Sequence, residues 1–167
     1  MVNRLDDRRV VVERDINASA ERIFDVLADP RRHPVIDGSG AVLDPTIAAP
    51  RRLSQGATFR MRMRSHPASA DPAHLLQAGI ALASRGRLKI TVVEFAEPRR
   101  IAWRNFGGHI WRYELEPITE ESTRVREIFD YATNRTPWLL ELVGFPTKNK
   151  ASMTRTLERL DALVTAE

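Results

Sequence analysis

Hydrophobic and polar residues alternate with a period of two in several short segments of the chain. The segment FRMRMR places Phe59, Met61 and Met63 on one side and three arginines on the other. Such alternation is typical of a strand with one core face and one solvated face. The alternative is a basic patch that binds phosphates, which usually gathers its charge on one helix or stripe.

Other segments have the same character, and the spacing between them predicts how they pair. The expected strands are residues 9–16, 88–95, 100–106, 109–117 and 123–131, and the irregular segment 41–55 has room for a short edge strand. The last four are joined by short connections, which are typical of an antiparallel meander.

Helical periodicity predicts the remaining elements. Ser19 suits the N-cap of a first helix, and Asp29-Pro30 suits the start of a second. A helix is expected at 73–84, and 137–145 is a short helix or a packed loop. The last helix, from about residue 147, carries one apolar stripe that consists of Met153, Leu157, Leu160 and Val164.

These elements predict one α+β domain over residues 9–166, after a flexible tail at 1–8. The terminal helix is the natural cover for one face of an open antiparallel sheet. Residues 66–87 form an insertion between two strands, and a structured insertion of this size often serves as a lid.

Composition narrows the class of protein. The chain has 167 residues, 43% of them hydrophobic and none of them cysteine, which excludes disulfides and thiolate chemistry. The 26 basic residues are interspersed with 22 acidic ones, so we expect no nucleic-acid partner in spite of a net charge of +4. The start of the chain lacks the apolar core of a signal peptide, and no apolar run is long enough for a membrane span. We therefore expect a cytoplasmic protein.

Four segments carry a resemblance to a known family. VVERDINASAERIFDVLADPRRHPVID, GGHIWRYELEP, TRVREIFDY and GFPTKNKASMTRTLERLDALV resemble the START-related SRPBCC superfamily, and within it the polyketide cyclase/dehydrase-like subgroup. The resemblance implies a helix-grip fold, in which a curved antiparallel sheet wraps around a long C-terminal helix and leaves an internal cavity. Periodicity alone is equally consistent with a filled core. The fold also hosts many functions.

Strand alternation and the terminal helix predict which side chains would bind a ligand in such a cavity. They are Phe59, Met61, Met63, Ile90, Val92, Glu94, Trp103, His109, Trp111, Tyr113, Glu127, Phe129, Met153 and Leu157. Methionines suit a pocket for variable apolar ligands, and they suit ordinary packing equally well.

Two glutamates, Glu94 and Glu127, are expected on the apolar face, where a carboxylate is costly unless it is paired. Burial would raise the pKa of Glu127, which could then orient a ligand or move a proton together with His109 or Tyr113. Alternatively, Glu127 pairs with an arginine at the strand edge, or the strand register differs by one residue.

The histidines and the loop after the first helices offer weaker signals. His33 and Asp37 lie on a loop that commonly borders the cavity mouth in this family, although Asp37 also suits an Asx turn. The four histidines have no metal-ligand spacing, so we expect no metal and no cofactor.

Three functions remain open on the sequence alone. The first is the binding of a hydrophobic small molecule, either a lipid or a polyketide-like compound, in the cavity. The second is a cyclase or dehydratase with an acid–base pair chosen from Glu127, His109 and Tyr113. The third is an interaction protein that binds another protein or a nucleic acid through its arginine-rich convex face. A homodimer is compatible with all three.

Overall fold

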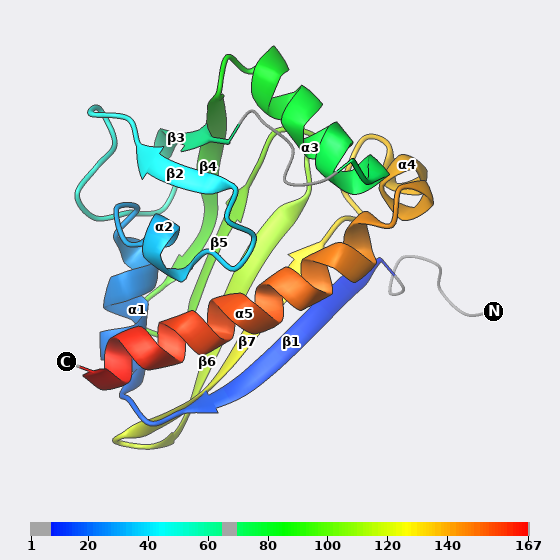
Figure 1. The fold of residues 1–167 in the computed structure, drawn as a ribbon. Coiled ribbons are helices and arrows are strands. Elements are labelled where there is room, and N and C mark those ends of the chain that lie inside the picture. The colour runs from blue at the N-terminus through cyan, green and yellow to red at the C-terminus, as the bar shows by residue number, and fades with distance from the viewer. Residues whose placement is uncertain (1–7, 65–69, 167) are drawn as a thin grey trace.

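The computed structural model describes residues 8–64 and 70–166 and contains one seven-stranded antiparallel sheet with helices packed against it (Figure 1). The strands are β1 (Arg9–Ile16), β2 (Val42–Pro45), β3 (Thr58–Met63), β4 (Arg87–Ala96), β5 (Arg100–Arg104), β6 (Ile110–Thr119) and β7 (Ser122–Asp130). The helices are α1 (Ala20–Ala28), α2 (His33–Ile36), α3 (Pro72–Ala83), α4 (Pro137–Leu142) and α5 (Phe145–Ala166). The expected α+β class is confirmed.

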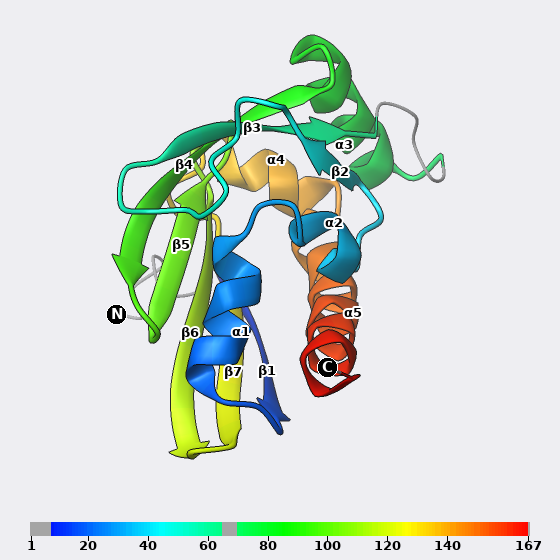
Figure 2. The ribbon, with the colours of Figure 1, turned by 90° about the vertical axis from the view of Figure 1, so that its left-hand side faces the viewer.

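The sheet is strongly curved, and α5 lies in its concavity. The strand order is β1-β7-β6-β5-β4-β3-β2, so the short β2 is an edge strand. Figure 2 looks along α5 and shows the sheet bending from β1 over to β2. The helix packs on β1 and β7, whereas α1, α2 and α3 occupy the space towards the other strands (Figures 1 and 2).

The terminal helix is held by the apolar stripe that the sequence predicts. Met153, Leu157, Leu160 and Val164 are each at most 2% exposed. The helix begins at Phe145, two residues before the expected start. The loop that contains Gly38 lies directly on it, because a Cβ at this position would come within 2.1 Å of the backbone oxygen of Ser152.

The first helices differ in part from expectation. Ser19 caps α1 as predicted, since its hydroxyl accepts a hydrogen bond from the Arg22 N–H at 3.3 Å. Asp29 does not start a second helix at Pro30. Its carboxylate accepts from the Arg31 N–H at 3.0 Å, which makes an Asx turn, and α2 starts at His33.

The alternating segment around residue 60 forms β3 as expected. Phe59 and Met61 are buried, Met63 is half-buried, and the three arginines are exposed on the convex side. The segment is therefore a strand with a wet face, as its alternation predicts.

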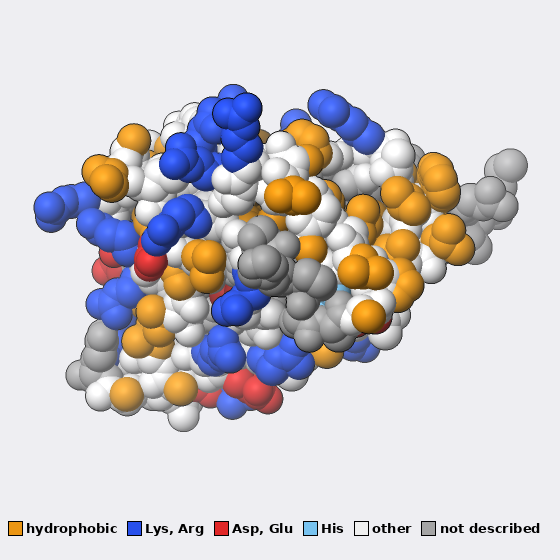
Figure 3. Space-filling view, turned by 45° about the horizontal axis from the view of Figure 1, so that its top comes forward, with side chains coloured by type: hydrophobic (Ala, Val, Ile, Leu, Met, Phe, Trp, Pro, Cys, Tyr) orange, Lys and Arg blue, Asp and Glu red, His pale blue; other side chains and the backbone are white. Residues whose placement is uncertain are grey.

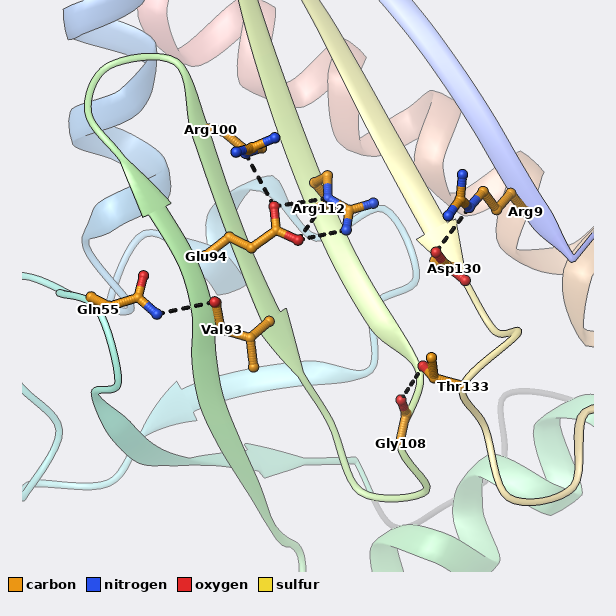
Figure 4. Close-up of polar contacts among 9 residues, drawn as sticks. All are labelled: Arg9, Gln55, Val93, Glu94, Arg100, Gly108, Arg112, Asp130 and Thr133. Atoms are coloured by element: carbon orange, nitrogen blue, oxygen red, sulfur yellow. Dashed lines mark hydrogen bonds and ion pairs between the residues drawn. The ribbon is translucent and has the colours of Figure 1, made fainter. Parts of the chain in front are cut away.

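Strand β4 contains an irregularity that reverses its faces. Val92 pairs with Trp103, but Glu94 pairs with Ala102, so one extra residue stands in β4 between these pairs. Such a bulge shifts the alternation by one position. The prediction that Glu94 faces the interior is therefore wrong, and its side chain lies on the outer face (Figure 4).

The segment between β3 and β4 is partly described. Residues 72–83 form α3, close to the predicted helix, whereas 65–69 lie outside the described residues, as does most of the expected tail at 1–8. Of the two alternatives for residues 137–145, the short helix is correct over 137–142.

Candidate functional site

A cavity of about 170 Å³ lies between the concave face of the sheet, α5, α2 and α3. Its walls carry mostly apolar and aromatic side chains, and the exposed Phe106 marks the side where the cavity reaches the surface. The cavity that the resemblance implied is therefore present, and the core is not completely filled.

Nine of the fourteen predicted ligand-binding residues line this cavity. They are Met61, Met63, Ile90, Trp103, His109, Trp111, Tyr113, Glu127 and Met153. Four others, Phe59, Val92, Phe129 and Leu157, face the interior but belong to the packed core around it. Glu94 lies on the opposite side of the sheet.

The centre of the cavity wall is a Tyr113–Glu127 pair. The two residues are cross-strand partners on β6 and β7, and the Tyr113 hydroxyl donates a hydrogen bond of 2.8 Å to Oε1 of Glu127. Oε2 of Glu127 is buried and has no hydrogen-bond partner in the described part of the chain. Burial raises the pKa of Glu127 to about 8, although the bond from Tyr113 lowers it.

The alternative reading of Glu127 as one half of a surface ion pair is not what the structure has. The neighbouring arginines of β7 point outwards, where Arg124 pairs with Asp15 and Arg126 pairs with Glu13. Glu127 is 3% exposed, and among the described residues its hydrogen-bond partner is the tyrosine hydroxyl. Its carboxyl is therefore protonated near neutral pH, and its second oxygen offers an O–H to the cavity.

His109 lines the same cavity but belongs to a different hydrogen-bond group. Its Nδ1 lies 3.2 Å from Nδ2 of Asn134, whose Oδ1 accepts from the Thr136 N–H at 2.9 Å. This second contact fixes the asparagine amide, so Nδ1 accepts and the neutral ring carries its proton on Nε2. Burial lowers the pKa of His109 to about 4, and within the described chain no hydrogen bond joins it to Tyr113 or Glu127.

His33 is the first residue of the short helix α2 rather than a loop residue, Asp37 follows the end of that helix, and both line the cavity. Nε2 of His33 lies 2.9 Å from the Leu27 carbonyl oxygen, and the ring stacks on Trp103 at 4.9 Å between centroids. Burial lowers the pKa of His33, so it is a neutral wall residue. Asp37 makes the expected Asx turn by accepting from the Ser39 N–H at 3.0 Å.

Several lining residues escaped sequence reasoning. On α5 they are Asn149, Ser152 and Thr156, which lie at helical spacing around Met153. Extending the apolar stripe by one turn towards the start of the helix would have found Asn149. Asn105 and Phe106 lie in the loop after β5, which ends at Arg104, two residues before the expected end of the strand. Alternation from the inward-facing Trp103 would have pointed to Asn105. Gln77, Ile80 and Ala81 come from α3.

Helix α3, which covers one side of the cavity, is bound to the start of α5. Asp71 caps α3 by accepting from the His74 N–H at 3.1 Å, and the Lys148 ammonium pairs with the same carboxylate. Nδ1 of His74 lies 2.7 Å from Oδ2 of Asp71. This cluster fixes the end of α3 that follows the undescribed residues.

The surface around α3 is apolar. The exposed hydrophobic side chains here are Leu75 and Leu82 of α3, Phe106, and Trp138 and Leu142 of α4. Hydrophobic side chains gather in the region of α3 and α4 in Figure 3. The side chain of Phe106 connects this surface with the cavity.

The outer face of the sheet contrasts with the cavity in its pairing. Glu94 accepts from Arg112 and also pairs with Arg100, while Arg9 pairs with Asp130 (Figure 4). The Arg112 hydrogen bond lowers the pKa of Glu94. Charged groups on this face compensate one another.

The described residues contain no group of three or more His, Cys, Asp or Glu that could hold a metal ion. None of the described helices has the length and apolar character needed to cross a membrane.

Comparison with known proteins agrees with this architecture. The chain is 31% identical to uncharacterized protein Rv0088 of Mycobacterium tuberculosis over 150 residues, which are 87% of this chain and 59% of that protein. The chain thus spans less than two thirds of the length of this relative.

Solved structures share the whole fold at low sequence identity. A protein from Arthrobacter aurescens matches 98% of this chain and 89% of its own with a TM-score of 0.66 and 13% identity. Norcoclaurine synthase from Thalictrum flavum, solved with dopamine and hydroxybenzaldehyde, matches 95% of this chain and 87% of its own with a TM-score of 0.62 and 14% identity. These matches confirm the helix-grip fold.

A family model described as polyketide cyclase / dehydrase and lipid transport matches residues 7–165. This description favours the binding of a hydrophobic ligand, which agrees with the apolar cavity. The chain therefore belongs to the polyketide cyclase/dehydrase and lipid transport family.

Proposed function

We propose that the protein binds a compact, mostly apolar small molecule in the cavity, with the Tyr113–Glu127 pair as its polar contact. The observation that carries this proposal is the combination of apolar walls with a buried carboxyl whose second oxygen has no partner. Ligand sites typically join a hydrophobic lining to a few polar groups that fix orientation.

The size of the cavity supports a small ligand over a long-chain lipid. An apolar cavity of about 150 Å³ in another protein holds one benzene molecule, and the volume here is about 170 Å³. One ring with its substituents fits this space. The aromatic walls, which include Trp103 and Trp111, suit stacking on such a ring.

The helix α3 is proposed to act as a lid. It supplies Gln77, Ile80 and Ala81 to the lining, its first turn is fastened by the Asp71–Lys148 pair, and Leu76 packs on the apolar cluster around Phe129. Opening at this contact would admit a ligand from the apolar surface around Phe106.

A second candidate is an enzyme that uses Glu127 as an acid or base. The specific observation is the raised pKa of about 8, because a catalytic carboxyl is most useful when it titrates near the working pH. Neutral His109 would then donate a hydrogen bond from Nε2 rather than exchange protons. A cyclase or dehydratase acting on a polyketide-like carbonyl compound fits these roles.

Native mass spectrometry of freshly purified protein, followed by extraction and identification of bound molecules, tests the binding proposal. The matched variants are Ala81→Phe, which fills the cavity from α3, and Ala83→Phe, which changes an exposed position of the same helix. We expect a ring-sized adduct in the wild type and in Ala83→Phe, and none in Ala81→Phe. An adduct retained by folded Ala81→Phe would contradict the proposal.

Glu127→Gln separates the two functions. A binding protein should keep its affinity for the extracted molecule within a few fold, because the amide still occupies the same space. An enzyme should lose turnover of that molecule by about 100-fold or more, the usual contribution of one acid–base group.

A further inference from the structure

Three buried side-chain atoms in the described part of the chain have no hydrogen-bond partner, and their residues all line the one cavity. They are Oδ1 of Asn105, Oε2 of Glu127 and Nδ2 of Asn149. Native proteins leave few buried polar groups unpaired, because each has lost its water without gaining a partner. Three such atoms around one cavity point to a partner that enters it.

The three residues come from different walls. Asn105 follows β5, Glu127 lies on β7, and Asn149 lies on α5. They offer one acceptor, one carboxyl group and one donor. A molecule between them needs at least one hydrogen-bond donor and one acceptor, placed on different sides of its apolar body.

The charges around the cavity restrict this molecule further. No lysine or arginine is among the described lining residues, whereas Asp37 and Glu127 supply carboxyl groups. Burial lowers the pKa of both His33 and His109, so neither supplies positive charge near neutral pH. A buried carboxylate or phosphate would find no counter-charge, which is costly in an apolar site.

We propose that Asn105 and Asn149, together with Glu127, select an uncharged ring compound that carries both a hydroxyl and a carbonyl group, and reject anions of the same size. The inference rests on the proposed function, since it concerns the ligand of that cavity. It makes Asn105 and Asn149 specificity-determining residues and excludes free fatty acids and acyl phosphates as preferred ligands.

Three small probes of nearly equal size test this selection. They are 4-hydroxyacetophenone, which carries a donor and an acceptor, acetophenone, which lacks the hydroxyl, and 4-hydroxybenzoate, which is an anion at pH 7. Binding is measured by titration calorimetry and by NMR of the tryptophan side chains. We expect 4-hydroxyacetophenone to bind about fivefold tighter than acetophenone, the usual worth of one hydrogen bond. The anion should bind at least about tenfold more weakly than 4-hydroxyacetophenone.

The variants assign the discrimination to residues. Asn105→Leu should bring 4-hydroxyacetophenone and acetophenone to within about twofold of each other, because it removes the acceptor for the hydroxyl. Asn149→Leu should weaken both ketones by a similar factor, because both carry the carbonyl. Gln55→Leu is the control, since this amide bonds the Val93 carbonyl outside the cavity (Figure 4). It should change no affinity.

The outcomes separate this inference from the proposed function. Equal binding of the anion and the neutral probes, unchanged selectivity between the two ketones in folded Asn105→Leu, or unchanged affinity for both ketones in folded Asn149→Leu, would overturn the inference and assign the three atoms to water. Failure of every probe to bind, with nothing extracted from the purified protein, would overturn the proposed function as well. If a leucine variant does not fold, Asn105→Ser and Asn149→Ala replace it. The wild-type comparison of anion with ketone needs no variant.

Discussion

Glu94 and Glu127 occupy strands of the same sheet, yet their carboxyl groups lie in opposite environments. Glu94 is on the convex face, where Arg112 and Arg100 compensate its charge and the Arg112 bond lowers its pKa. Glu127 is on the concave face, where burial raises its pKa to about 8 and Tyr113 is its one hydrogen-bond partner within residues 8–64 and 70–166. The convex face therefore compensates the carboxylate charge with arginines, whereas the concave face removes the charge by keeping the carboxyl group protonated.

The largest expected effect of this difference is on how stability depends on pH. The pKa of Glu127 is about 8 in the folded protein and near 4.5 when unfolded. Between these pH values the folded state keeps a proton that the unfolded state has lost. The contribution of Glu127 to the stability of the fold therefore falls as pH rises. The slope is about 1.4 kcal/mol per pH unit, which gives about 5 kcal/mol over the window.

Glu127→Gln should remove this slope. Urea unfolding between pH 5 and pH 9 would show the variant gaining stability relative to the wild type as pH rises, with the gain levelling off above about pH 8. Glu120→Gln, at an exposed turn, is the matched control and should follow the wild type. Parallel curves for the wild type and Glu127→Gln would mean that Glu127 is not isolated in the way described.

Glu94 should show the opposite sign. Its lowered pKa means that its ion pairs stabilise the fold above about pH 4.5, and that this contribution is lost as pH falls through the folded-state pKa. Glu94→Gln should cost about 1 to 2 kcal/mol at pH 7, the usual worth of a charge-assisted hydrogen bond, and progressively less as the pH falls through the folded-state pKa of Glu94. A double-mutant cycle with Arg112→Met measures the coupling directly, and a coupling near zero would contradict this account.

Removal of the Tyr113 hydroxyl sharpens the contrast. The hydroxyl stabilises the ionised form of Glu127, so Tyr113→Phe should raise the pKa of Glu127 still further. It should also destabilise the fold by about 1 kcal/mol, because one more buried oxygen loses its partner. A carbon-detected NMR titration of the glutamate side chains follows the pKa, and a fall in the pKa of Glu127 would contradict the assigned direction of the bond.

The same two glutamates mark the extent of what the sequence predicts. Strict alternation places Glu127 and Tyr113 correctly, because β6 and β7 keep regular pairing in this region. The alternation of β4 breaks between Val92 and Glu94, and a bulge depends on the partner strand rather than on local periodicity. The site is therefore predictable where side-chain direction follows a period of two.

The helix and the loop at the cavity repeat this lesson. The stripe that begins at Met153 predicts the buried face of α5, and one more helical turn would have added Asn149. Asn105 lies two residues after Trp103, so alternation over the expected strand 100–106 would have pointed to it, but β5 ends at Arg104 and Asn105 stands in the loop that follows. The proposed ligand selection depends partly on loop positions of this kind. The sequence therefore predicts the fold better than it predicts the ligand specificity.

The smallest expected effect concerns α3, which covers the cavity and keeps Glu127 away from water. Lys148→Met removes the cation that fastens α3 through Asp71, so α3 should open more often and hydrate the cavity. Because burial is the main cause of the raised pKa, the pKa of Glu127 should fall, by less than about one unit. Amide exchange in α3 should become faster at the same time.

Lys150→Met is the control, because it changes an exposed position of α5, the helix that also carries Lys148. It should change neither the pKa of Glu127 nor the amide exchange in α3. Faster exchange in α3 with an unchanged pKa would mean that the sheet and α5 isolate the carboxyl on their own, and the contrast between the two glutamates would then depend only on the two faces of the sheet.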